Sequence, residues 1–115
     1  IRIPVLLAAG SSDRHRPLWG VERVYQNLSI PCKSKLILAG GGHDLFCIAA
    51  SDVAMATDVG GLEPGLWNAH QAHDVINHFT TAFLLDVLKG DPEAREAMRP
   101  GAAAFERVHY STTWK

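Results

Sequence analysis

Two apolar runs, each ending in glycine and followed by an ionisable residue, constrain the fold of this chain more than any other feature. Residues 4–9 (PVLLAA) are continuously apolar and lead through a glycine and two serines to Asp13. Residues 35–39 (KLILA) are followed by three glycines and then by His43 and Asp44. A continuous apolar run, rather than an alternating one, is typical of a strand that is covered on both faces, as in a parallel sheet.

The segment between the two runs has the pattern of an amphipathic helix. Within residues 17–28, apolar side chains recur at intervals of three and four: Leu18, Val21, Val24, Tyr25 and Leu28. Strand, helix and strand over about 35 residues predict a βαβ unit, whose right-handed crossover makes the two strands parallel. Both carboxyl ends then lie at one edge of the sheet. Asp13 and His43 can meet there, because neighbouring strands are about 4.8 Å apart.

The C-terminal half contains the clearest helix. In residues 68–90 the predicted buried stripe is Ile76, Phe79, Phe83 and Val87, widened by Leu84 and Leu88. Gly90 suits the position after the last turn, and Asp91 followed by Pro92 predicts the start of a second helix over residues 91–98. Residues 47–58 are compatible with a short helix, residues 59–67 with a loop, and residues 107–114 with a short edge strand.

Composition and charge set several classes of function aside. At 115 residues the chain is one small domain, or part of a larger one, and 47% hydrophobic residues with 20% charged ones predict a buried core. A formal net charge of −1 gives no electrostatic reason to expect nucleic acid or an anionic membrane as a partner. No apolar run approaches the roughly 18 residues of a membrane span. The chain opens without a methionine or a signal-peptide pattern, and the location is left open between the cytoplasm and secretion.

The cysteines and histidines give no firm site of their own. Cys32 and Cys47 flank the second predicted strand, and a disulfide needs the chain to fold straight back so that the two Cα atoms approach within about 7 Å. Otherwise both are small buried side chains. His70 and His73 stand at i, i+3, as zinc-binding pairs do, but no cysteine or carboxylate completes a set, so we expect no metal and no other cofactor.

Asp13 and His43 form a candidate catalytic pair. A carboxylate that accepts a hydrogen bond from one imidazole nitrogen fixes the tautomer and leaves the other nitrogen free to act as a general base. The alternative for Asp13 is a turn residue that bonds its own backbone, and His43 has a structural alternative as well. Asp44 is interpreted as a loop or helix-capping carboxylate. Trp19 and Trp67 are interpreted either as core residues or as the lining of a pocket near the sheet edge.

The order strand, GSSDR, helix, strand, GGGHD resembles the last third of an α/β-hydrolase. The nearest branch is that of the dienelactone hydrolase-like and acetylhydrolase-like esterases, whose closing helix resembles residues 76–91. The resemblance covers nearly the whole chain. It implies a fold class of α/β, with residues 1–115 forming the C-terminal portion of a hydrolase domain with an incomplete sheet. It also implies Asp13 as the acid of a catalytic triad, His43 as its base, and a small ester as the substrate of the full-length enzyme.

The chain departs from this family because it contains no nucleophile motif. The superfamily's serine lies in a G-x-S-x-G elbow that precedes the acid, and no such motif occurs in these 115 residues. We therefore expect no activity from this chain alone. Two hypotheses remain: the C-terminal segment of a serine hydrolase that cleaves carboxylic esters, and a non-catalytic truncated module. The second would act by self-association or partner binding, since so few strands leave apolar edges uncovered.

Overall fold

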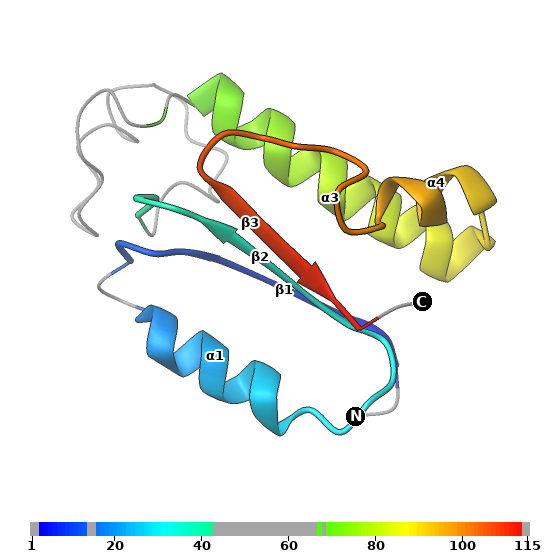
Figure 1. Cartoon of the computed structure of the whole chain (residues 1–115), viewed down its shortest axis with the longest axis horizontal. Helices are drawn as coiled ribbons and strands as arrows, with labels where there is room; N and C mark the ends of the chain where they lie inside the picture. The colour runs from blue at the N-terminus through cyan, green and yellow to red at the C-terminus, as the bar shows by residue number, and fades with distance from the viewer. Residues whose placement is uncertain (1–2, 14–15, 43–66, 68, 114–115) are drawn as a thin grey trace.

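The computed structural model describes residues 3–13, 16–42, 67 and 69–113 of the chain. Its elements are, in order, β1 (Val5–Gly10), α1 (Leu18–Asn27), β2 (Lys33–Leu38), α3 (Ala69–Lys89), α4 (Pro92–Ala97) and β3 (Val108–Thr112) (Figure 1). The described residues therefore form a small mixed α/β fold around one sheet. None of the helices in this part of the chain combines the length and the apolar character needed to cross a bilayer.

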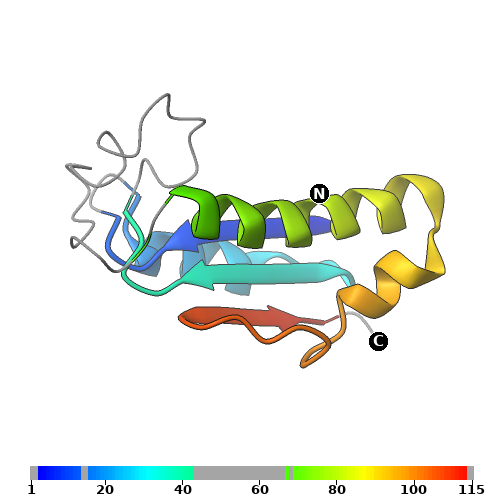
Figure 2. The ribbon, with the colours of Figure 1, turned by 90° about the horizontal axis from the view of Figure 1, so that it is seen from above.

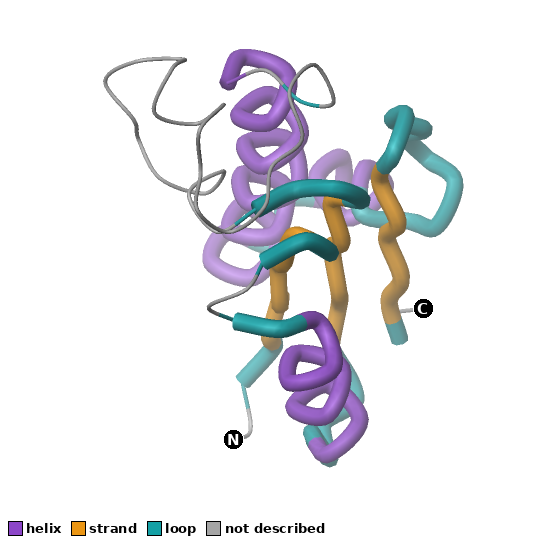
Figure 3. The backbone as a smooth tube through the Cα atoms, turned by 90° about the vertical axis from the view of Figure 1, so that its left-hand side faces the viewer, coloured by secondary structure: helices purple, strands orange, loops and turns teal. Residues whose placement is uncertain are grey.

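The sheet has the strand order β1-β2-β3. β1 and β2 are parallel, in a register that runs from Val5 opposite Lys33 to Gly10 opposite Leu38, so the predicted βαβ unit is confirmed. β3 pairs antiparallel with β2 and lies at the sheet edge, as predicted for residues 107–114. β2 begins two residues before its predicted start. α1 covers one face of the sheet and α3 the other, which is clearest when the sheet is seen from above and along its strands (Figures 2 and 3).

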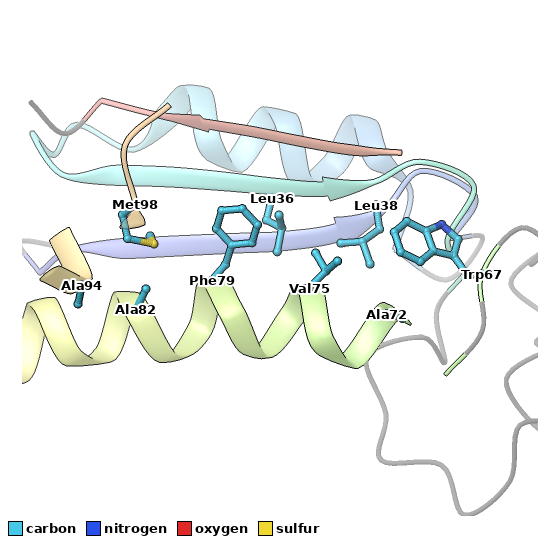
Figure 4. Close-up of a cluster of buried hydrophobic side chains, with 9 residues drawn as sticks. All are labelled: Leu36, Leu38, Trp67, Ala72, Val75, Phe79, Ala82, Ala94 and Met98. Carbon is cyan, nitrogen blue, oxygen red and sulfur yellow. The ribbon is translucent and has the colours of Figure 1, made fainter. Parts of the chain in front are cut away.

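The hydrophobic core lies between the sheet and α3 (Figure 4). Its centre is Phe79, whose ring stacks on Tyr110 at 4.7 Å between centroids and meets Phe105 edge-on at 6.0 Å. The buried members of this core are Leu36, Leu38, Trp67, Ala72, Val75, Phe79, Ala82, Ala94 and Met98. β3 thus contacts α3 through aromatic rings, and β2 contributes Leu36 and Leu38 to the same core.

The predicted buried stripe of α3 is wrong in part. Leu84 and Leu88 are 46% and 72% exposed, and Ile76 and Phe83 are only partly buried. Phe79 is buried as predicted, and the other buried positions of the helix are Ala72, Val75, Ala82 and Asp86. α3 thus turns two alanines inward beside Val75 and Phe79, and leaves large apolar residues on its flank and outer side.

The predicted helix ends are confirmed. α3 stops at Lys89, and Gly90 follows with a φ of +66°, in the left-handed region that favours glycine. The side chain of Asp91 then accepts hydrogen bonds from the backbone N–H groups of Glu93 and Ala94, which begins α4. These signals were readable because each acts over only a few residues.

Charged and aromatic side chains join α1 to the sheet. None of the residues of α1, which the structure describes throughout, is fully buried. The Lys35 ammonium lies 2.7 Å from a carboxylate oxygen of Glu22. Lys33 and Lys35 also stand over the ring of Tyr25, at 4.6 and 4.9 Å from its centroid. Long polar side chains of β2 therefore contribute much of the contact between α1 and the sheet.

Candidate functional site

Asp13 lies buried in the turn that joins β1 to α1. Its backbone N–H donates to the carbonyl of Gly10 at 3.3 Å, and its Oδ1 accepts from the backbone N–H of Arg16 at 2.8 Å. The second bond is the backbone-capping role that the sequence left as an alternative.

The glycine turn after β2 packs directly against the turn that holds Asp13. The N–H of Ser12 donates to the carbonyl of Gly41 at 2.9 Å, and the N–H of Gly40 donates to Oγ of Ser11 at 2.8 Å. Gly40 has a φ of +78°, which only glycine adopts without strain. A Cβ atom on Gly10 would overlap the carbonyl of Gly41. The glycines are therefore required for the close approach of two backbones, and the two turns form one unit at the carboxyl ends of β1 and β2.

His43, Asp44 and Cys47 lie outside the described residues. The structure therefore does not test the pairing of Asp13 with His43, which stays a prediction. The described turn leads to Gly42, which is buried and is the residue directly before His43. Cys32 is a half-buried free thiol.

A cleft of about 170 Å³ lies between the start of α3 and the segment before β3, close to the carboxyl end of β2. Its lining residues are Trp67, Gln71, Asp74, Val75, Phe105, Glu106 and Arg107. Trp67 is fixed there by a 2.8 Å hydrogen bond from Nε1 to the carbonyl of Ala39, and the guanidinium of Arg107 lies 5.3 Å from the centroid of its ring. Trp67 therefore both packs in the core and lines the cleft, which are the two interpretations that the sequence analysis left open for this residue.

Arg107 is a residue that sequence reasoning missed. Its φ is +60°, uncommon for a residue with a side chain, and its carbonyl accepts from the N–H of Ala39 at 2.8 Å. Its Nε is buried and has no hydrogen-bond partner among the residues that the structure describes. No sequence signal marks this conformation, because the residue carries neither the flexibility of glycine nor the local bonding of asparagine.

The other aromatic and histidine candidates lie elsewhere. Trp19 is exposed on α1, so the core interpretation of this residue is wrong. His70 is exposed at the start of α3, and His73 is half-buried. His78 packs its ring between Phe79 and Phe105, at 5.0 and 5.3 Å between centroids. Within the described residues, no group of three or more metal-ligating side chains could hold an ion.

Comparison of the chain with protein-family models, with curated proteins and with solved structures found no match. The interpretation of this site therefore depends on the residues and the geometry of the chain itself.

Proposed function

We propose that this chain is the C-terminal segment of a serine-type α/β-hydrolase that cleaves carboxylic esters, with Asp13 as triad acid and His43 as triad base. The observation that supports it is the hydrogen-bonded contact between the two turns. Asp13 lies in the first turn, and the second turn ends at Gly42. His43 follows Gly42 by a single peptide bond, a Cα step of about 3.8 Å. We therefore expect an imidazole carried at this position to reach a carboxylate on the neighbouring turn.

The proposed chemistry divides the work between the two side chains. Asp13 accepts a hydrogen bond from one imidazole nitrogen and stabilises the imidazolium that forms during the reaction. His43 takes the proton from the nucleophilic serine with its other nitrogen and returns it to the leaving alcohol. The serine and the oxyanion donors would come from outside these 115 residues, since no elbow motif occurs in them.

A direct test measures the histidine titrations in the wild-type chain and in Asp13→Asn. Asparagine keeps an oxygen that can accept from Arg16 N–H but removes the charge. We expect the pKa of His43 to be lower in this variant, because the anion no longer stabilises the imidazolium. Imidazole NMR spectra report each ring separately. The exposed His109 serves as an internal reference, and Glu93→Gln, an exposed site on α4, removes the same charge elsewhere. An equal pKa of His43 in all three proteins would refute the pairing.

An ester-hydrolysis assay tests the missing nucleophile. With ethyl acetate, an unactivated ester that an imidazole alone does not cleave appreciably, the chain alone should release product no faster than its His43→Ala variant. Faster turnover that depends on both Asp13 and His43 would show that a nucleophile is present in this chain, and would contradict its assignment as an incomplete segment.

The second candidate, a non-catalytic module that acts by self-association, has its own supporting observation. Large apolar side chains stand exposed on both helices that flank the sheet: Trp19 and Val24 on α1, and Leu84, Leu85 and Leu88 on α3. Exposed apolar side chains that gather on one helix, as Leu84, Leu85 and Leu88 do near the end of α3, are typical of an interaction site.

A further inference from the structure

Ala39, which lies between the end of β2 and Gly40, is bonded through both of its backbone groups. Its N–H donates to the carbonyl of Arg107 at 2.8 Å, and its carbonyl accepts from Nε1 of Trp67 at 2.8 Å. Figure 4 shows the indole of Trp67 at one end of the core, beside Leu38. Trp67 precedes α3 and Arg107 precedes β3, so two segments that are remote in the sequence meet at this one residue.

The two partners of Ala39 also contact each other. The guanidinium of Arg107 lies 5.3 Å from the centroid of the Trp67 ring, a distance at which a cation is attracted to the ring face. Trp67 is 6% exposed, so water is largely excluded from this contact. Ala39, Trp67 and Arg107 thus form a closed set of three contacts, which we call the Ala39 clamp.

Arg107 makes these contacts from an unfavourable conformation. Its φ of +60° is in the left-handed region, which residues with a Cβ atom rarely adopt, and its buried Nε finds no acceptor in the described part of the chain. Its ion pair with Glu106 returns little, because that carboxylate lies 3.4 Å from Nη1 on a side chain that is 83% exposed. Strained residues of this kind concentrate at functional sites. Among the described contacts of this side chain, the stack on Trp67 is the one that favours an arginine here.

The glycine turn that follows Ala39 has little stiffness of its own. Residues 40–42 are all glycines, which lack the Cβ atom that restricts the backbone, so the turn needs support from its neighbours. On one side the turn is bonded to Ser11 and Ser12, in the turn that follows β1. On the other side it begins at Ala39, and the clamp fixes that residue. The glycine turn is thus held between two supports.

We propose that Trp67 and Arg107 are positioning residues, which act through Ala39 to hold the glycine turn in place against the turn of Asp13. This role rests on the proposed function, in which the side chain that follows the glycine turn must meet the Asp13 carboxylate. A catalytic rate falls steeply when reacting groups are misplaced, so this support acts on the reaction without touching the substrate. Trp67 supplies the hydrogen bond to Ala39, and Arg107 keeps the indole in the orientation that makes it.

Amide hydrogen exchange, followed by NMR, tests the clamp on residues that the structure describes. The probes are the N–H groups of Ser12 and Gly40, which bond across the two turns and are distant in sequence from the substitutions. Trp67→Phe keeps an aromatic ring but removes the donor to Ala39, so local opening should make both amides exchange at least about tenfold faster. Met98→Ala, a buried site at the opposite end of the core, controls for lost stability and should change both rates less than about threefold (Figure 4).

Two substitutions of Arg107 separate its side chain from its backbone. Arg107→Asn tolerates the left-handed conformation and keeps the carbonyl that Ala39 bonds, but it removes the stack on Trp67. It should accelerate exchange of the two amides at least about threefold, and Arg107→Lys, which keeps a cation near the ring, should lie between this variant and the wild type. Wild-type rates in Arg107→Asn would overturn the role of the guanidinium. Far-UV circular dichroism checks that each variant is folded.

The titration of His43 reports whether the clamp acts on the proposed site. Asp13→Asn is introduced into the wild type, Trp67→Phe and Met98→Ala, and the change that it causes in the pKa of His43 is compared among the three. This change should fall by at least half in Trp67→Phe and persist in Met98→Ala, because lost stability alone does not alter contacts within folded molecules. An undiminished change in Trp67→Phe, or the same exchange rates there as in the wild type or in Met98→Ala, overturns the proposal. A change that is absent already from the wild type refutes the proposed function instead, and the exchange rates still decide whether the clamp holds the turn.

Discussion

The ion pair between α3 and α4 allows a sharp prediction about stability. The carboxylate of Asp86, with a side chain 1% exposed, contacts Nε of Arg95 at 3.0 and 3.2 Å and its Nη2 at 3.0 Å. The side chain of Arg95 is 63% exposed. The two partners are therefore unequal: removing Asp86 leaves a cation that water solvates, whereas removing Arg95 leaves a buried anion.

The position of Asp86 in α3 makes this inequality larger. It lies in the last turns of the helix, where the dipole disfavours a negative charge. Breaking a buried pair from one side costs about 3–5 kcal/mol. Since Arg95 is itself near the surface, water can reach the carboxylate once the guanidinium is gone, so we expect Arg95→Ala to lower the free energy of unfolding by about 2–3 kcal/mol. Asp86→Asn, which removes the charge but keeps an acceptor, should lower it by about 1 kcal/mol.

Urea unfolding at pH 7, followed by far-UV circular dichroism, measures these differences. With a slope near 1.3 kcal/mol per molar urea, Arg95→Ala should move the midpoint by about 2 M. The double variant Asp86→Asn with Arg95→Ala should be more stable than Arg95→Ala alone, because it no longer buries a charge. A double variant less stable than Arg95→Ala, or an Arg95→Ala variant within about 0.5 kcal/mol of the wild type, would refute the reasoning.

Two further pairs of substitutions test the packing of the sheet. Gly10→Ala should destabilise the chain by more than about 3 kcal/mol because its Cβ overlaps Gly41, whereas Gly20→Ala, with open space inside α1, should stabilise it by about 0.5–1 kcal/mol in the same urea titration. Phe79→Ala should lower the free energy of unfolding by about 3–5 kcal/mol, against less than about 0.5 kcal/mol for the exposed Leu88→Ala on the same helix; similar losses for both would contradict the assigned orientation of α3.

Local signals in the sequence predicted the elements, and long-range contacts decided how they face one another. Gly90 and Asp91 act on their own neighbours, so the end of α3 and the start of α4 were predicted correctly. The rotation of α3 was not, because Phe79 stacks on Tyr110 from a strand 31 positions further along the chain. The burial of Asp86 also depends on a distant partner, because Arg95 of another helix pairs with its carboxylate. A stripe of large apolar residues therefore predicts a helix better than it predicts its buried face.

In the candidate site, too, local sequence signals predicted the elements and long-range contacts decided the details. The turn of Asp13 at the carboxyl end of β1 followed from the βαβ pattern, whereas the conformation of Arg107 had no signal, because it depends on the carbonyl that this residue offers to Ala39. Three glycines after a strand favour a tight turn. Their second role, the approach of Gly41 to Gly10, appears only when both strands are in register.

This second role links the sequence of the glycine turn to the position of Asp13. Ser11 N–H donates to the carbonyl of Leu38 at 3.1 Å, Ser12 N–H donates to Gly41, and Ser11 Oγ accepts from Gly40. Each of these bonds is worth about 1 kcal/mol, and together they hold one turn against the other. A displacement of about 1 Å can lower a catalytic rate a hundredfold, so a site assembled from two loops needs them to move as one body. In the hydrolase that we propose, the bonded turns would meet that requirement before any substrate binds.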